Sequence, residues 1–98
     1  MAADIGQQGP PRLDGVMILA SIHFVLKAEE RLKKADIVHD VIPVPRRLGS
    51  DCGMAIAFAS RDLPAVCAAL KRAAITIARL YRKDAEGYTL IPNDVNES

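Results

Sequence analysis

The hydrophobic pattern between residues 15 and 83 alternates between strand-like and helix-like segments, and this alternation limits the folds open to the chain. Short apolar segments are typical of β-strands, whereas apolar residues at every third or fourth position are typical of amphipathic helices. The strand-like segments are 15–20, 38–44, 53–59 and 75–83. The helix-like segments are 22–35, capped by Ser21, and a second that begins at Ser60 or Asp62 and has Leu63, Val66, Cys67, Leu70 and Ala74 on its apolar face.

The order β-α-β-β-α-β predicts an α+β fold of the ferredoxin-like βαββαβ sandwich type. Right-handed crossovers then give a four-stranded antiparallel sheet in the order 4-1-3-2, with both helices on one face. This order makes the second strand an edge. Pro43 and Pro45 agree with that position, because proline cannot donate to the neighbouring strand of a sheet.

The 98 residues are enough for one domain, which we place at 15–83. Residues 1–14 and 84–98 are rich in polar residues, Gly or Pro, and we expect an N-terminal and a C-terminal tail there. Residues 88–91 in the second of these are a candidate for a further short strand.

The sheet face away from the helices needs a cover of its own. The first strand is apolar on both sides, and the third carries Ala55, Ala57 and Ala59 on the side opposite its bulky residues. We therefore expect a homo-oligomer packed through this open sheet face. The alternative is that the C-terminal tail covers it.

Composition excludes several classes of protein. A net charge of +1 and the absence of Trp and of a basic stripe argue against nucleic-acid binding. Apolar runs such as 16–20 are too short to span a bilayer, and residues 1–14 lack the apolar core of a signal peptide. With two cysteines and no export signal, we expect a cytoplasmic protein without a structural disulfide.

Cys52 is the best candidate for a chemically active residue. The first and second strands of the predicted fold run parallel, so Cys52, at the start of strand three, should lie beside the N-terminus of the first helix. That terminus presents unpaired N–H groups and a partial positive charge. Arg46 and Arg47 add two cations, opposed by Asp51. Such surroundings lower a thiol pKa below its usual value of about 8.5 and favour the thiolate.

The neighbours of Cys52 each have a functional and an ordinary interpretation. His23 is a candidate proton shuttle or a solvated helix residue. Arg46 and Arg47 are candidates to hold an anion or are an exposed loop pair. Gly53 leaves the backbone open to a ligand. Cys67, by contrast, lies on an apolar helix face and is expected to pack in the core.

Other chemistries lack the residues they need. No CxxC pair occurs, the His and Cys spacing matches no metal site, and no glycine-rich phosphate loop is present. We therefore expect no metal and no cofactor. A Cys–His hydrolase would need a third, orienting group and a substrate cleft, for which the chain offers little.

Two motifs point to a known family. The residues Ile42-Pro43-Val44-Pro45-Arg46, followed by Ser50-Asp51-Cys52-Gly53, resemble short bacterial and archaeal domains described as selenium/sulfur carrier-like proteins. The resemblance covers roughly residues 16–82. It implies that Cys52 is the carrier residue, with Ser50, Gly53 and Arg46 as its motif neighbours.

Our leading hypothesis is a carrier rather than an enzyme. Cys52 would accept sulfur or selenium as a persulfide or selenosulfide from a protein donor and pass it to a protein acceptor. Ser21, the first helix and Arg46 would stabilise the anion. The alternative is a non-catalytic module, such as a sheet dimer, whose loop binds a small ligand or regulates a partner protein. Thiol-based peroxide sensing is a third interpretation that requires Cys52 alone.

Overall fold

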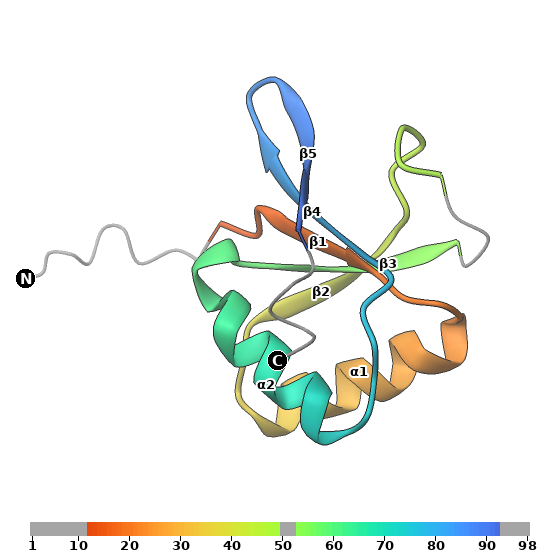
Figure 1. Ribbon diagram of the computed structural model, residues 1–98, viewed down its shortest axis with the longest axis vertical. Helices are drawn as coiled ribbons and strands as arrows, with labels where there is room; N and C mark the ends of the chain where they lie inside the picture. Colours follow the sequence, from red (N-terminus) through yellow and green to blue (C-terminus); the bar gives the residue numbers. More distant parts are fainter. Residues whose placement is uncertain (1–11, 50–52, 93–98) are drawn as a thin grey trace, which may run out of the picture.

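A computed structural model describes residues 12–49 and 53–92, which form two helices packed on one side of an antiparallel sheet (Figure 1). The sheet has five strands in the order β2-β3-β1-β4-β5. The elements are β1 (Gly15–Ile18), α1 (Ile22–Lys34), β2 (His39–Pro43), β3 (Met54–Phe58), the 3-10 turn η2 (Ser60–Asp62), α2 (Leu63–Arg72), β4 (Arg79–Asp84) and β5 (Gly87–Ile91). The α+β class is confirmed, and β2 lies at an edge as its prolines predict.

The predicted count of four strands is wrong. The first four strands do lie in the order 4-1-3-2, but β5 adds a fifth beside β4, with Leu80 opposite Ile91. This strand falls within residues 84–98, which the sequence assigns to a tail. β4 also begins later than predicted, at Arg79, because Ile75 and Ile77 belong to the segment before it and are buried in the core.

Helix α1 begins and packs largely as its pattern predicts. Ser21 is the N-cap, and its hydroxyl oxygen accepts a hydrogen bond from the Phe24 amide at 3.4 Å. The residues that face the sheet are Val25, Ala28 and Leu32. Ile22, the first residue of the helix, is 47% exposed. No helix in the described part of the chain is long and apolar enough to cross a membrane.

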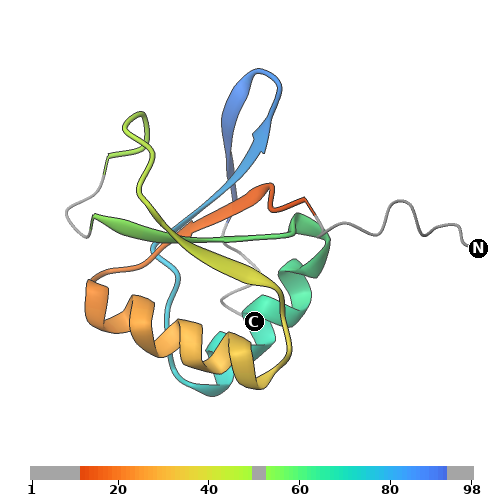
Figure 2. The same cartoon turned by 180° about the vertical axis from the view of Figure 1, so that it is seen from behind.

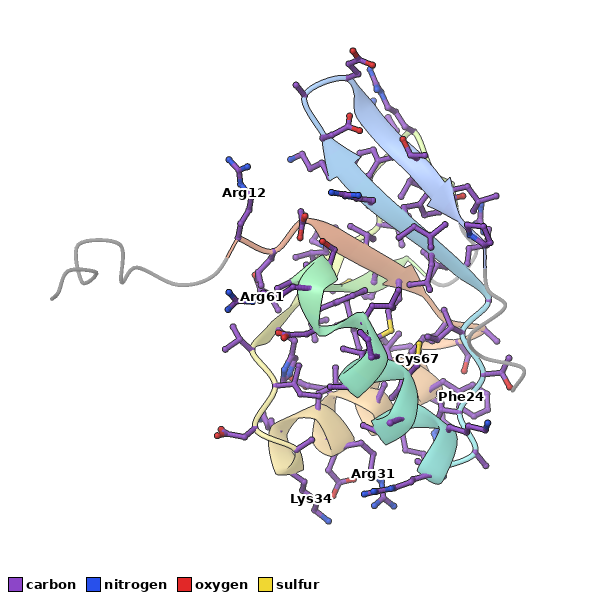
Figure 3. The ribbon with its side chains drawn as sticks, turned by 60° about the vertical axis from the view of Figure 1, so that its left-hand side comes forward. Arg12, Phe24, Arg31, Lys34, Arg61 and Cys67 are labelled. Carbon is purple, nitrogen blue, oxygen red and sulfur yellow. The ribbon has the colours of Figure 1, made fainter. Side chains whose placement is uncertain are left out.

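The main core lies between the sheet and the helices. Met17 from β1, Phe58 from β3 and Leu80 from β4 are fully buried against Leu32 and Leu70 of the two helices. Burial of each such side chain contributes about 1.5–3 kcal/mol. The predicted core position of Cys67 is confirmed, since this α2 residue is 6% exposed within the same cluster (Figure 3).

The other face of the sheet is covered by the chain itself. Val16, Ile18 and Ala55 are buried there, and the residues that pack on them include Leu48, Tyr81 and Tyr88. The helices lie on one side of the sheet, and the 44–49 segment and the β4–β5 hairpin rise on the other (Figures 1 and 2). The face is therefore not open, which removes the argument for a homo-oligomer through it. The homo-oligomer itself stays a prediction.

Asp14 joins the start of β1 to the start of the α2 region. Its carboxylate accepts hydrogen bonds from the Ser60 amide and the Ser60 hydroxyl, both at 2.8 Å. Burial by itself would raise the pKa of this carboxyl group, but the Ser60 hydrogen bonds and the nearby Arg82 outweigh burial and hold the pKa below its ordinary value.

Candidate functional site

The segment that follows β2 is a closed loop whose ends are held together. The Val44 amide donates to the Gly53 carbonyl at 3.1 Å, which continues the β2–β3 pairing beyond Pro43 and Met54. Inside the loop, the Leu48 amide donates to the Pro45 carbonyl at 2.9 Å and closes a β-turn. These two backbone hydrogen bonds hold residues 44–49 from within the loop.

Two glycines border the segment 50–52 that contains Cys52. Gly49 has φ +60° and Gly53 has φ +82°, a backbone region that glycine adopts at little cost. No heavy atom of the described residues lies within 4 Å of a Cβ added at either position. The requirement for glycine is therefore conformational, and the space on the side where a Cβ would project is open.

Arg79 anchors this loop from strand β4, which is separated from β3 by β1 in the sheet. Its guanidinium donates to the carbonyl oxygens of Leu48, at 3.1 Å, and of Gly49. It also donates to the Tyr81 hydroxyl at 3.0 Å and lies 5.8 Å from the centre of the Tyr81 ring. Sequence reasoning missed Arg79, because an arginine at the start of a strand carries no signal that it binds a loop thirty residues away.

Arg46 and Arg47, the two predicted anion ligands, lie in the turn and are exposed. Neither forms an ion pair with a carboxylate among residues 12–49 and 53–92. The Arg47 guanidinium reaches the β4–β5 turn, where it lies 2.9 Å from the position of a Cβ added to Gly87. Arg46 is therefore the freer of the two to meet a ligand.

The start of α1 lies at the same end of the sheet as this loop (Figures 1 and 2). Both β1 and β2 pair antiparallel with β3, so the segments that follow β1 and β2 leave the sheet at one end. His23 is exposed, with its ring edge to face against Phe24 at a centroid separation of 5.5 Å. The Ser21 hydroxyl is engaged in capping α1.

The predicted carrier residue Cys52 and its neighbour Ser50 lie outside the described residues. Their surroundings can be judged from the segments beside them. At this end of the sheet, the described residues 19–24, 44–49, 53–54 and 78–81 contain three arginines and no Asp or Glu. The arginines are Arg46, Arg47 and Arg79. Positive charge together with a helix N-terminus favours an anion at this end, and Asp51, which lies outside the described residues, opposes it by charge.

Comparison with known proteins places the chain in a family. A family model described as "Putative Se/S carrier protein-like" matches residues 14–82. The chain belongs to this family. No curated protein and no solved structure matches the chain. The matched range contains every predicted site residue from Ser21 to Gly53, and it also contains Arg79. Strand β5 lies beyond it.

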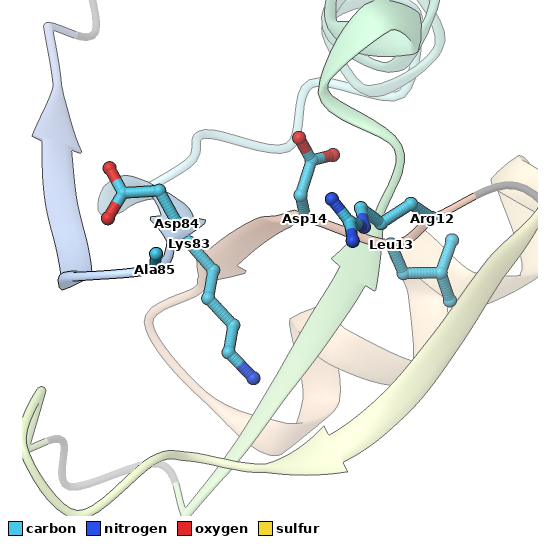
Figure 4. Close-up of a pocket in the computed structure, with 6 residues that line it drawn as sticks. All are labelled: Arg12, Leu13, Asp14, Lys83, Asp84 and Ala85. Atoms are coloured by element: carbon cyan, nitrogen blue, oxygen red, sulfur yellow. The ribbon is translucent and has the colours of Figure 1, made fainter.

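Four cavities lined by described residues lie away from this loop. One of about 370 Å³ is at the opposite end of the sheet, between the start of β1 and the end of β4 (Figure 4). Its lining includes two cations, Arg12 and Lys83, and two carboxylates, Asp14 and Asp84. Asp14 is committed to Ser60. Within residues 12–49 and 53–92, no three His, Cys, Asp or Glu side chains form a group that could hold a metal ion.

Proposed function

We propose that the protein carries sulfur or selenium on Cys52 as a persulfide or selenosulfide and delivers it to a partner protein. The observation that carries the proposal is the anchored loop. Arg79, the β-turn and the Val44–Gly53 hydrogen bond fix both ends of the short segment that contains Cys52. A carrier must present its reactive atom to two different proteins in turn, and a short segment held at both ends suits that presentation.

The transfer chemistry is two successive thiolate exchanges. The Cys52 thiolate attacks the outer sulfur of a donor persulfide, the donor's S–S bond breaks, and the donor leaves as a thiolate. An acceptor thiolate then attacks the outer sulfur on Cys52, and Cys52 leaves as a thiolate. Neither exchange has a net oxidation or reduction, so no cofactor is required. Selenium would follow the same course as a selenosulfide.

The residues around the loop would act on the anionic forms of Cys52. Arg46 and the first N–H groups of α1 would stabilise the thiolate and the persulfide by charge and hydrogen bonding. His23 is exposed and would move the proton of the thiol to solvent. The Ser21 contribution would be indirect, through the N-terminus that it caps. The protein would thus be a cosubstrate of its donor and acceptor.

Alkylation by iodoacetamide as a function of pH tests the activated thiolate, with Cys67 as internal control. Cys67 is buried, and burial raises the pKa of its thiol, so it should stay unreacted in the native protein. Cys52 should react with an apparent pKa well below about 8.5. An inaccessible Cys52, or one that titrates like a free thiol, would contradict the proposal.

The second candidate function is anion or protein binding by the loop, and the exposure of Arg46 and Arg47 favours it. The two functions differ in their response to substitution. Loss of sulfur transfer on Cys52→Ser, with partner binding retained, supports the carrier. Tolerance of Cys52→Ser combined with loss of binding on Arg46→Ala or Arg47→Ala would favour the binding module.

A further inference from the structure

Strand β5 leaves an unprotected edge on the sheet. It pairs with β4 on one side, and no described strand pairs with it on the other. Its sequence, Gly-Tyr-Thr-Leu-Ile, contains no charge and no proline. Edge strands of soluble proteins are usually blunted by charged side chains, proline or bulges, because their unpaired N–H and C=O groups otherwise recruit another strand.

The opposite edge of the same sheet is protected in this way. Strand β2 contains Asp40, whose side chain is exposed, and ends on Pro43, which has no N–H to donate. The contrast between the two edges indicates that β5 is open for pairing and β2 is not.

A row of apolar side chains crosses the sheet and ends at β5, where its last member is exposed to solvent. Val16 of β1, Tyr81 of β4 and Leu90 of β5 lie side by side across the sheet, on the face away from the helices. Val16 is 3% exposed, but Leu90 is 59% exposed. Tyr88, two residues before Leu90, points to the same face and packs on the Val16 cluster. An apolar side chain placed beyond Leu90 would complete the row.

We propose that β5 pairs antiparallel with β5 of a second copy, so that one sheet runs through both subunits. A register centred on Thr89 sets Tyr88 opposite Leu90 of the partner subunit, and the converse pair forms by symmetry. Each exposed Leu90 then gains an aromatic neighbour across the new strand pair, a type of contact that stabilises sheets. In this register Gly87 lies opposite Ile91 of the partner subunit, and the acidic Glu86 of the β4–β5 turn falls outside the paired residues.

A second copy is the occupant that fits this edge because β5 is complementary to itself. When a strand pairs antiparallel with a second copy of itself about residue i+1, residue i of one copy lies opposite residue i+2 of the other. The two side chains must therefore be compatible, and Tyr88 and Leu90 are both apolar over most of their surface. Such pairing also needs an edge without like charges, and β5 has none. The pairing uses β5 alone and is independent of any chemistry at Cys52.

The molar mass in solution tests this pairing, measured by light scattering after gel filtration under reducing conditions, which exclude disulfide dimers. The wild-type chain should have twice the mass of one chain at micromolar concentration. Leu90→Lys should convert it to a monomer with an unchanged circular dichroism spectrum. Leu26→Lys is the matched control, because Leu26 on α1 is also 59% exposed, and it should leave the dimer intact. A monomeric wild type, a dimer that survives Leu90→Lys, or equal loss in both variants would overturn the proposal.

Cross-linking tests the register in a chain that also carries Cys52→Ser and Cys67→Ala. Thr89→Cys should be captured as a dimer by a short bis-maleimide reagent, because the two Thr89 positions face each other across the two-fold axis. Thr76→Cys, at another exposed threonine, should not. Equal capture at both positions, or none at position 89, would contradict a register centred on Thr89.

Discussion

Arg79 Nη1 donates to the carbonyl oxygen of Leu48 at 3.1 Å, across 31 positions of sequence. Together with its bond to Gly49, this contact fixes the loop immediately before the segment that contains Cys52. The same loop supplies Leu48 to the apolar cluster on the face of the sheet away from the helices. One arginine therefore links the cover of the sheet to the position of the candidate site.

Arg79→Ala should loosen the 44–49 loop. Hydrogen bonds from a charged donor contribute about 1.5–3 kcal/mol when buried, and partial exposure here reduces the expected loss of unfolding free energy to about 1–2 kcal/mol. The Leu48 and Val44 amides, which bond within the loop, should exchange with solvent faster. Lys83→Ala, at an exposed position on the same strand, is the control. Unchanged exchange in Arg79→Ala would show that the loop holds without it.

Gly49→Ala should destabilise the protein by about 1–2 kcal/mol, because φ +60° is a left-handed conformation that alanine resists. An added Cβ meets no atom of the described residues, so the expected cost is one of backbone conformation and not of collision. Gly49→Asn should cost less, since asparagine tolerates this conformation. Denaturant unfolding of both variants gives the comparison. Equal losses for Ala and Asn would contradict the conformational explanation.

The Asp14–Ser60 contact should make stability depend on acid pH. The pKa of Asp14 is lower in the folded state, so its contribution is present above the ordinary carboxyl value of 3.8 and is lost as pH falls through the folded-state pKa. Ser60→Ala removes the hydroxyl bond and should cost about 1 kcal/mol at neutral pH. Asp14→Asn should flatten the acid limb of a plot of unfolding free energy against pH. The same acid limb in the variant and the wild type would exclude this role.

The contribution of Cys67 to the free energy of unfolding should depend on alkaline pH. Burial raises the pKa of its thiol, so the neutral thiol stabilises the fold below the ordinary value of 9.0, and this contribution is lost as pH rises through the higher folded-state pKa. Cys67→Ser should destabilise more than Cys67→Ala, because a buried hydroxyl without a partner costs about 1–3 kcal/mol. Thermal unfolding at several pH values measures both effects. If Ser is tolerated better than Ala, the site is not apolar.

Periodicity predicted the regular elements well where a segment had one clear apolar face. The helix predicted over 22–35 is observed as Ile22–Lys34, and the prolines identified β2 as an edge. The same pattern gave a wrong strand boundary where apolar residues are buried outside any helix or strand. Ile75 and Ile77 look like strand residues because they are β-branched and apolar, yet they fill the core from a connecting segment. β5 is short and sits in a polar region, so the sequence indicates residues 88–91 only as a candidate for a further strand, counted with the tail.

The cover of the second sheet face could not be read from local sequence. It depends on the path of the 44–49 loop, and that path depends on Arg79, which is remote in the chain. Ala55 and the apolar first strand correctly indicated that something must cover this face. They could not distinguish a second molecule from the chain's own loop, because both bury the same side chains.

Sulfur loading of Cys52 is the direct test of whether this protein is a carrier. The protein would be incubated with a cysteine desulfurase and L-cysteine, or with inorganic polysulfide as a protein-free donor, and then analysed by intact-mass and peptide mass spectrometry. If the protein is a sulfur carrier, we expect one added sulfur atom on Cys52, and a thiol acceptor should release it. Cys52→Ser should gain no sulfur, and Cys67 should stay unmodified. No sulfur on Cys52 from either donor, or equal loading of Cys67, would contradict the carrier function.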